Sequence, residues 1–84
     1  MNNFDQLKKK ILYRSGHRAT KEMDLLLSNF VKKYINDFGI VELKQLDSLL
    51  NFDDDSLFKW YLNKRSKIKV PNNKVWNLLK NFKI

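Results

Sequence analysis

The side chains best suited to chemistry or binding gather in one short stretch of the chain. Basic residues come first and two carboxylates follow: Arg14, His17, Arg18, Lys21, Glu22 and Asp24. A catalytic histidine needs a nucleophile and an orienting acid beside it, and the local sequence supplies neither. Two carboxylates two positions apart point about 200° from each other on a helix, so they cannot act as a facing acid–base pair. The stretch therefore favours a surface role over catalysis.

The other candidate sites for chemistry are weaker. Asp53, Asp54 and Asp55 are well placed to cap a helix and to meet its dipole, and they lack the spaced ligands and the Gly of a calcium loop. The chain has no Cys, which excludes thiol catalysis and Cys-based zinc sites. It also has no Gly-rich phosphate-binding motif. We expect no catalytic residue, no metal ligand, no stably bound cofactor and no enzymatic activity.

Apolar residues at helical spacing predict an all-α protein. We expect a compact bundle of five short helices in a single domain, residues 1–84, with the second helix at its centre. The expected helices cover residues 3–15, 20–37 and 41–51, then one from the acidic cluster at 53–56 to 63, and one from a cap at 71–73 to the C-terminus.

Some positions carry more specific structural expectations. Gly16 is expected to end the first helix with a positive φ, and Asn63 to close the fourth in the same left-handed region. The predicted inward faces include four residues near their edges: Leu12, Leu25, Ile40 and Leu62. Trp60 and Trp76 are left open between the core and a surface patch.

The charge balance suggests an alternative class of function. A net charge of +8 invites a nucleic-acid reading, and basic clusters occur at Lys8-Lys9-Lys10, Lys32-Lys33, Lys64-Arg65 and Lys67-Lys69. These clusters are spread over several helices instead of one recognition helix, which weakens that reading. No apolar run approaches the ~20 residues that span a bilayer, and no signal region opens the chain. We expect a cytoplasmic protein without stable membrane insertion.

Arg18 and Glu22 allow two interpretations. They could form an ordinary i,i+4 ion pair, or they could be an exposed polar anchor for a partner protein, since Arg binds carboxylates bidentately. Spacing alone leaves both open.

Two motifs carry a resemblance that covers nearly the whole chain. The first is Arg-Gly-x-x-Glu followed by x-Asp-x-x-Leu, present as Arg18 to Leu27 with Ala19 in place of the Gly. The second is an acidic cluster, then Leu-x-x-Trp and a Pro, present as Asp53 to Trp60 and Pro71. On these motifs the chain resembles the succinate dehydrogenase assembly factor 2 family, the flavinators.

The resemblance implies a small helical protein that is not an enzyme. Such proteins bind the flavoprotein subunit of succinate dehydrogenase, in some cases fumarate reductase, and promote covalent attachment of FAD, the cofactor of that client. Arg18 and Glu22 would then be partner-binding residues, with Ala19 at the motif's Gly and Arg14, His17 and Asp24 nearby as candidates. The free protein would be a monomer. A generic adaptor for another enzyme stays a third possibility.

Two residues depart from the family pattern. A methyl group at Ala19 is compatible with partner contact if the local φ is negative. Asn63 stands where many members have Gly, and Asn tolerates the same left-handed backbone.

Overall fold

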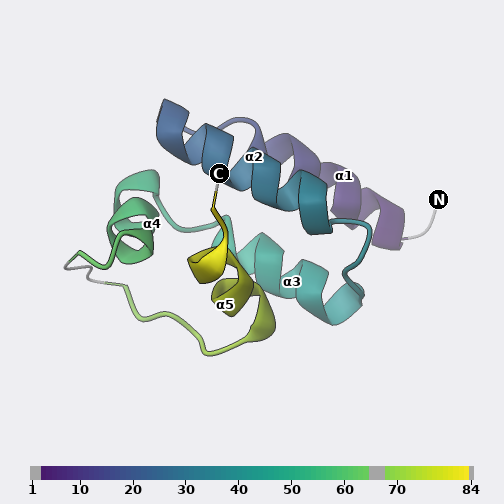
Figure 1. Ribbon diagram of the computed structural model, residues 1–84. Helices are drawn as coiled ribbons and strands as arrows, with labels where there is room; N and C mark the ends of the chain where they lie inside the picture. Colours follow the sequence, from purple (N-terminus) through teal and green to yellow (C-terminus); the bar gives the residue numbers. More distant parts are fainter. Residues whose placement is uncertain (1–2, 65–67, 84) are drawn as a thin grey trace.

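Five helices form the fold, and their order follows the predicted one. The computed structural model describes residues 3–64 and 68–83. Its helices are α1 (Asn3–Ser15), α2 (Lys21–Tyr34), α3 (Ile40–Leu49), α4 (Asp54–Tyr61) and α5 (Lys74–Asn81) (Figure 1). None of the described residues lies in a strand, so the all-α prediction is confirmed.

Side-chain caps fix where most of the helices begin. In three of them the residue before the helix accepts a hydrogen bond from a backbone N–H one turn on: Thr20 for α2, Asp53 for α4 and Asn73 for α5. At α3 the roles are reversed, because the Glu42 carboxylate accepts from the Gly39 N–H at 3.0 Å. The predicted starts of α2, α4 and α5 therefore rest on ordinary cap chemistry.

The helix ends differ from the prediction by a few residues. Helix α2 was expected to reach residue 37 but ends at Tyr34, and a turn closed by the Asp37 N–H on the Tyr34 carbonyl (2.9 Å) follows it. Helix α3 begins one residue earlier and ends two residues earlier than the predicted 41–51. Asn2 and Asn3 are both suited by type to cap α1; Asn3 is the first residue of the helix, and Asn2 lies outside the described residues.

Of the two residues expected in the left-handed region, one is there. Asn63 has a φ of 61°, and the N–H groups of Asn63 and Lys64 bond back to the carbonyls of Trp60 and Lys59 at 3.1 and 2.8 Å. This is the Schellman arrangement that ends α4. Gly16 follows the last residue of α1, as expected, but its φ is not positive: the end of α1 turns through ordinary backbone, with the Gly16 N–H on the Tyr13 carbonyl at 3.2 Å.

The core lies between the helices, and α2 supplies its largest share. The buried residues of α2 are Met23, Leu26, Leu27, Phe30 and Val31. Trp76 is fully buried and meets the half-buried Trp60 edge-on at 4.9 Å, so these rings belong to the core side of α4 and α5. The four edge positions predicted to face inward are wrong: Leu12, Leu25, Ile40 and Leu62 are all exposed.

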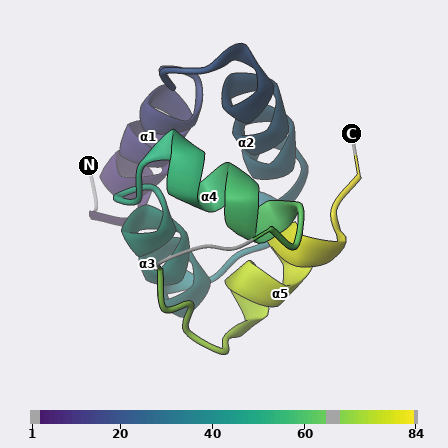
Figure 2. The ribbon, with the colours of Figure 1, turned by 90° about the vertical axis from the view of Figure 1, so that its left-hand side faces the viewer.

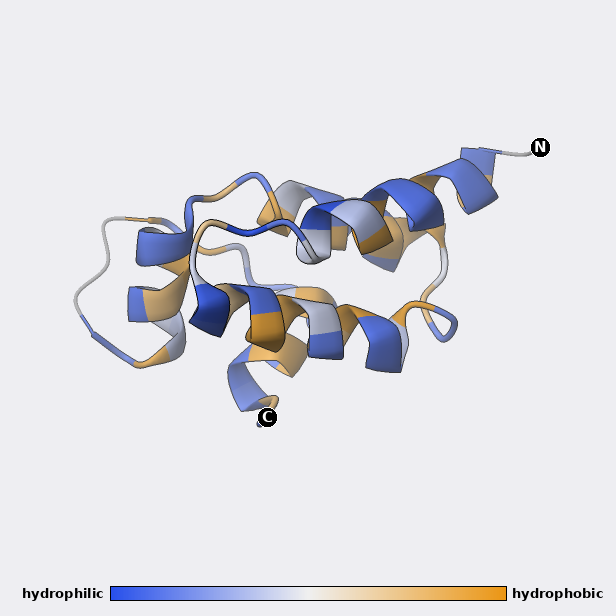
Figure 3. Ribbon diagram, turned by 90° about the horizontal axis from the view of Figure 1, so that it is seen from above, coloured by the Kyte–Doolittle hydropathy of each residue, from blue (hydrophilic) through white to orange (hydrophobic). Residues whose placement is uncertain are grey.

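The helices divide into a main body and one crossing element. Helices α1 and α2 form an antiparallel pair that lies over α3 and α5, and α4 crosses one end of the other four (Figures 1 and 2). The hydropathy colouring shows that the helices each carry a hydrophilic and a hydrophobic side (Figure 3). The connection between α1 and α2 lies at the same end of the molecule as α4, so the basic stretch and the acidic cluster come together.

Candidate functional site

Arg18 joins the α1–α2 turn to the segment between α3 and α4. Its Nε donates to Asp54 Oδ1 at 2.6 Å, its Nη1 to the Leu50 carbonyl at 2.9 Å and its Nη2 to the Phe52 carbonyl at 2.6 Å. The side chains of the ion pair are only 10% and 6% exposed. One guanidinium therefore neutralises a buried carboxylate and also satisfies two carbonyls at the end of α3, where a cation suits the helix dipole.

Asp54 completes this junction from the opposite direction. Its Oδ2 accepts from the Thr20 N–H at 2.9 Å, and Thr20 in turn caps α2. Burial by itself would raise the pKa of Asp54, but the hydrogen bonds from the Thr20 amide and from Arg18, with the Arg18 charge, outweigh it and hold the pKa below its ordinary value. Asp54 is thus ionised and bound in the folded state.

Of the two interpretations of Arg18 and Glu22, the i,i+4 ion pair is not formed, and only Glu22 of the proposed exposed anchor is exposed, since the Arg18 side chain is 10% exposed. Arg18 turns away from α2 to reach Asp54, although it stands four residues before Glu22. Sequence reasoning assigned the whole acidic cluster to capping, and only Asp53 does this at α4, by accepting from the Ser56 N–H at 3.0 Å. A single helix has a single N-cap position, so the second carboxylate of the run was free for another partner.

Arg14 makes a second connection, to α3. It donates to Asp47 Oδ1 at 2.7 Å and to Asn51 Oδ1 at 2.6 Å, and Lys10 lies 3.3 Å from the other Asp47 oxygen. The Arg14–Asp47 pair is more open than the Arg18 pair, at 26% and 23% exposure. No local feature of the sequence indicates these partners, because they lie more than thirty residues away.

The remaining predicted site residues face outward. His17 stacks on the exposed Tyr13 ring at 4.0 Å, and its Nδ1 lies 2.7 Å from the Tyr13 carbonyl. Glu22 is exposed and Asp24 is half-buried. Neither carboxylate has an ion pair with another described residue, so both are available to a partner.

Ala19 lies on the exposed side of the same turn. Among the described non-glycine residues only Asn63 has a positive φ, so the backbone at Ala19 accepts a Cβ without strain. The methyl group at this position is therefore compatible with the fold.

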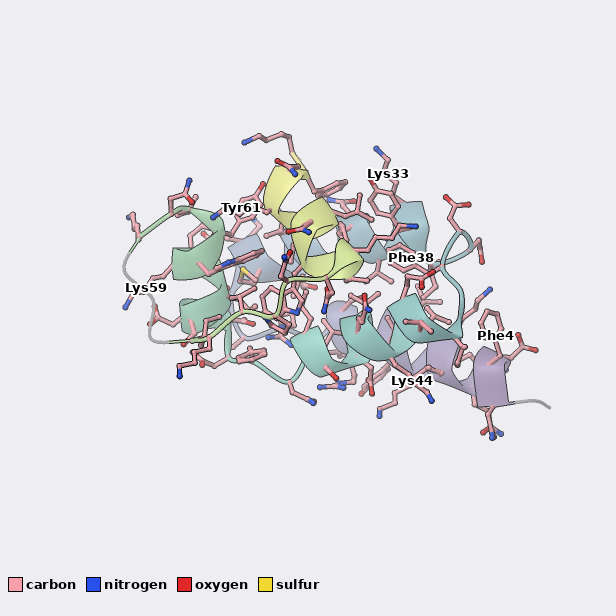
Figure 4. The ribbon with its side chains drawn as sticks, turned by 90° about the horizontal axis from the view of Figure 1, so that it is seen from below. Phe4, Lys33, Phe38, Lys44, Lys59 and Tyr61 are labelled. Atoms are coloured by element: carbon pink, nitrogen blue, oxygen red, sulfur yellow. The ribbon has the colours of Figure 1, made fainter. Side chains whose placement is uncertain are left out.

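Three lysines of the described helices lie apart from one another. Lys33, Lys44 and Lys59 extend from α2, α3 and α4 at separate places (Figure 4). Arg14 and Arg18 are neutralised by internal carboxylates. Arg65 and Lys67, which contributed to the nucleic-acid reading, lie outside the described residues.

Two features are absent from the described part of the chain. No group of three or more His, Cys, Asp or Glu residues in it could hold a metal ion. None of its helices combines the length and the apolar character needed to cross a membrane.

The fold and this turn define a class: a small all-helical protein whose polar α1–α2 turn is fastened to α4 by a buried ion pair, and whose exposed Glu22 has no ion pair among the described residues. Residues 9–83 match the family model described as the flavinator of succinate dehydrogenase. The chain therefore belongs to this family, and the resemblance seen in the two motifs is confirmed.

Curated relatives agree with the family match. The chain is 36% identical over 75 residues to the mitochondrial succinate dehydrogenase assembly factor 2-B of Drosophila willistoni, covering 87% of this chain and 48% of that protein. It is 42% identical over 63 residues to the mitochondrial assembly factor 2 of Scheffersomyces stipitis (75% and 42%), and 34% over 80 residues to that of Danio rerio (93% and 51%). The chain spans about half the length of these relatives.

Proposed function

We propose that this protein binds the flavoprotein subunit of succinate dehydrogenase and promotes covalent attachment of FAD to it. Family membership supports assembly of succinate dehydrogenase as the process. The observation that carries the binding proposal is the exposed Glu22 carboxylate, which has no partner among the described residues and lies in the first turn of α2, just after the turn that the Arg18–Asp54 pair holds in place.

The proposed binding surface is the outer side of the α1–α2 turn and the first turn of α2. Its contact residues are Glu22, Asp24, His17 and Ala19. Arg14 and Arg18 belong to the same surface in sequence, but their charged ends bond to α3 and α4. A cationic group of the flavoprotein opposite Glu22 would complete the contact.

Such a factor would act on the conformation of its client. If it binds most tightly to the flavoprotein state in which the flavin is aligned with the client histidine to which it becomes attached, it raises the population of that state by the difference in affinity. The turn presents no acid–base pair for the bond-forming step, so that chemistry would belong to the flavoprotein. The chain itself would be neither an enzyme nor a stable FAD carrier.

Charge reversal on α2 tests this proposal. We expect Glu22→Arg to abolish capture of the flavoprotein and to reduce its covalent flavin, read as in-gel flavin fluorescence after co-expression. Asp37→Arg is the matched control, because it makes the same charge change at an exposed carboxylate just beyond the other end of α2. Equal capture and flavin content with both variants would refute the binding surface.

Nucleic-acid binding gains no support from the family match. Cytoplasmic location and a monomeric free state stay predictions, and the relatives' names place those proteins in mitochondria. Fractionation of the native cell, with the flavoprotein followed alongside, would locate this chain.

A further inference from the structure

Asp54 stands where the two family motifs meet. It is the first residue of α4, yet Asp53 makes the cap of that helix. Both Asp54 oxygens are used instead on the α1–α2 turn: Oδ1 accepts from Arg18 Nε at 2.6 Å and Oδ2 from the Thr20 N–H at 2.9 Å. Its side chain is buried although its neighbours in the acidic run are exposed.

The contacts of Asp54 control the position of the proposed contact residue. Thr20 is held by its N–H, and its hydroxyl accepts the Met23 N–H at 3.3 Å to begin α2. Glu22 lies in the turn of helix that starts there. The direction of each Cα–Cβ bond on a helix is set by the position of that residue relative to the start of the helix. Holding Thr20, the N-cap of α2, in place therefore also sets the direction of the Glu22 side chain.

Arg18 is unsuited to be a direct contact. To reach a partner it would have to leave Asp54 and two carbonyls, and Asp54 would then keep its charge in a buried place with fewer donors. The same bonds suit Arg18 for holding the turn, because its planar fork fits several fixed acceptors at once.

We infer that Arg18 and Asp54 are positioning residues of the docking surface. Together they keep residues 18–22 in the conformation that a partner binds, and Arg18 itself does not touch the partner. This inference rests on the proposed function for the identity of the partner. Without the pair the turn samples other conformations, and the apparent affinity falls with the fraction of molecules that remain competent to bind.

A double-mutant cycle on binding separates positioning from contact. The purified flavoprotein subunit of succinate dehydrogenase is titrated with the wild type, Arg18→Ala, Asp54→Ala and the double variant, at a temperature where all are folded. We expect each single variant to weaken binding about tenfold or more and the double variant to bind no more weakly than the weaker single one. Multiplied losses in the double variant would mean that Arg18 contacts the partner directly, and would overturn the inference.

A remote variant controls for general loss of stability. Val75→Ala makes a cavity in α5, far in sequence from the turn, and should destabilise the protein to a similar degree. We expect its folded form to bind like the wild type. If Val75→Ala and Asp54→Ala lose the same affinity, the pair has only a general structural role and the inference fails.

Amide exchange on the free protein tests the turn without any partner. Asp54→Ala should speed exchange of the Thr20 N–H far more than that of the Asn73-capped Trp76 N–H, which lies in another part of the fold. Unchanged exchange at Thr20 would refute the positioning role. If the wild type fails to bind the flavoprotein, the proposed function fails, and this exchange measurement alone decides whether the pair holds the turn.

Discussion

Replacing Arg18 by Ala should be among the most costly single changes in this chain. The substitution removes three hydrogen bonds, leaves the buried Asp54 carboxylate without its cation, and removes a donor from the carbonyls of Leu50 and Phe52. Removal of one partner from a buried ion pair typically costs about 3–5 kcal/mol.

The size of the loss follows from the exposure of the pair. Water reaches the edge of the guanidinium, whose side chain is 10% exposed, so we place the loss at about 2–4 kcal/mol. A domain of this size has a free energy of unfolding of about 4–12 kcal/mol. The midpoint temperature should fall by about 10–30 °C, and part of the population could unfold near physiological temperature.

Urea unfolding followed by tryptophan fluorescence and by far-UV circular dichroism measures this loss. Arg14→Ala is the comparison, because its pair with Asp47 is more exposed and should be worth about 1 kcal/mol. Arg18→Lys should fall between the two, since one ammonium group cannot reach all three acceptors in the geometry of a guanidinium. A loss for Arg18→Ala no larger than that for Arg14→Ala would refute the reasoning.

Two further predictions concern pH and the end of α1. The pKa of Asp54 in the folded state lies below its ordinary value of 3.8. In acid the unfolded state therefore binds more protons than the folded state. The stability that the Asp54 carboxylate contributes is present above pH 3.8 and is lost as the pH falls through the folded-state pKa. Asp54→Asn should flatten this acid-side dependence in urea unfolding, and an unchanged slope would contradict it. Gly16 has no positive φ, and an added Cβ would meet only the Leu12 and Tyr13 carbonyls at 3.7 and 3.8 Å; Gly16→Ala should therefore stabilise the protein by about 0.4–1 kcal/mol, and a lower thermal midpoint would show that reasoning wrong.

The sequence predicted the helices well because their signals are local. Periodic apolar residues and caps such as Thr20 and Asn73 act over a few neighbouring residues. The residue type of Asn63 is itself a sign of left-handed backbone at that position. The errors concern residues at the edges of the apolar helix faces. Leu25 and Ile40 continue the apolar stripes of their helices in the sequence, but in the structure both side chains are exposed. Whether an edge position is covered depends on the angle between helices, which the stripe alone does not contain.

The candidate site was predicted only in part, for a related reason. Its location in the α1–α2 turn follows from residue types, whereas the direction of each charged side chain depends on distant partners. Arg18 has two possible carboxylate partners: Glu22, four residues away, and Asp54, thirty-six residues away. It pairs with Asp54, because the low dielectric constant around this buried carboxylate and its fixed donors strengthen the interaction. The signal that could have identified Asp54 is the run Asp53-Asp54-Asp55, because one helix has a single N-cap position and a further carboxylate of the run is free to bind another partner.

The Arg14–Asp47 and Arg18–Asp54 pairs also change the charge that the surface of the α1–α2 turn presents to a partner. The two arginines that make the stretch look basic are bound to Asp47 and Asp54, so their charge is largely cancelled inside the fold. The outward side keeps His17, Lys21 and the carboxylates of Glu22 and Asp24. A partner that docks here should therefore present positive charge opposite Glu22, even though the chain as a whole carries +8. Added salt should weaken such docking at the rim, while the buried Arg18–Asp54 pair beneath it stays largely unscreened.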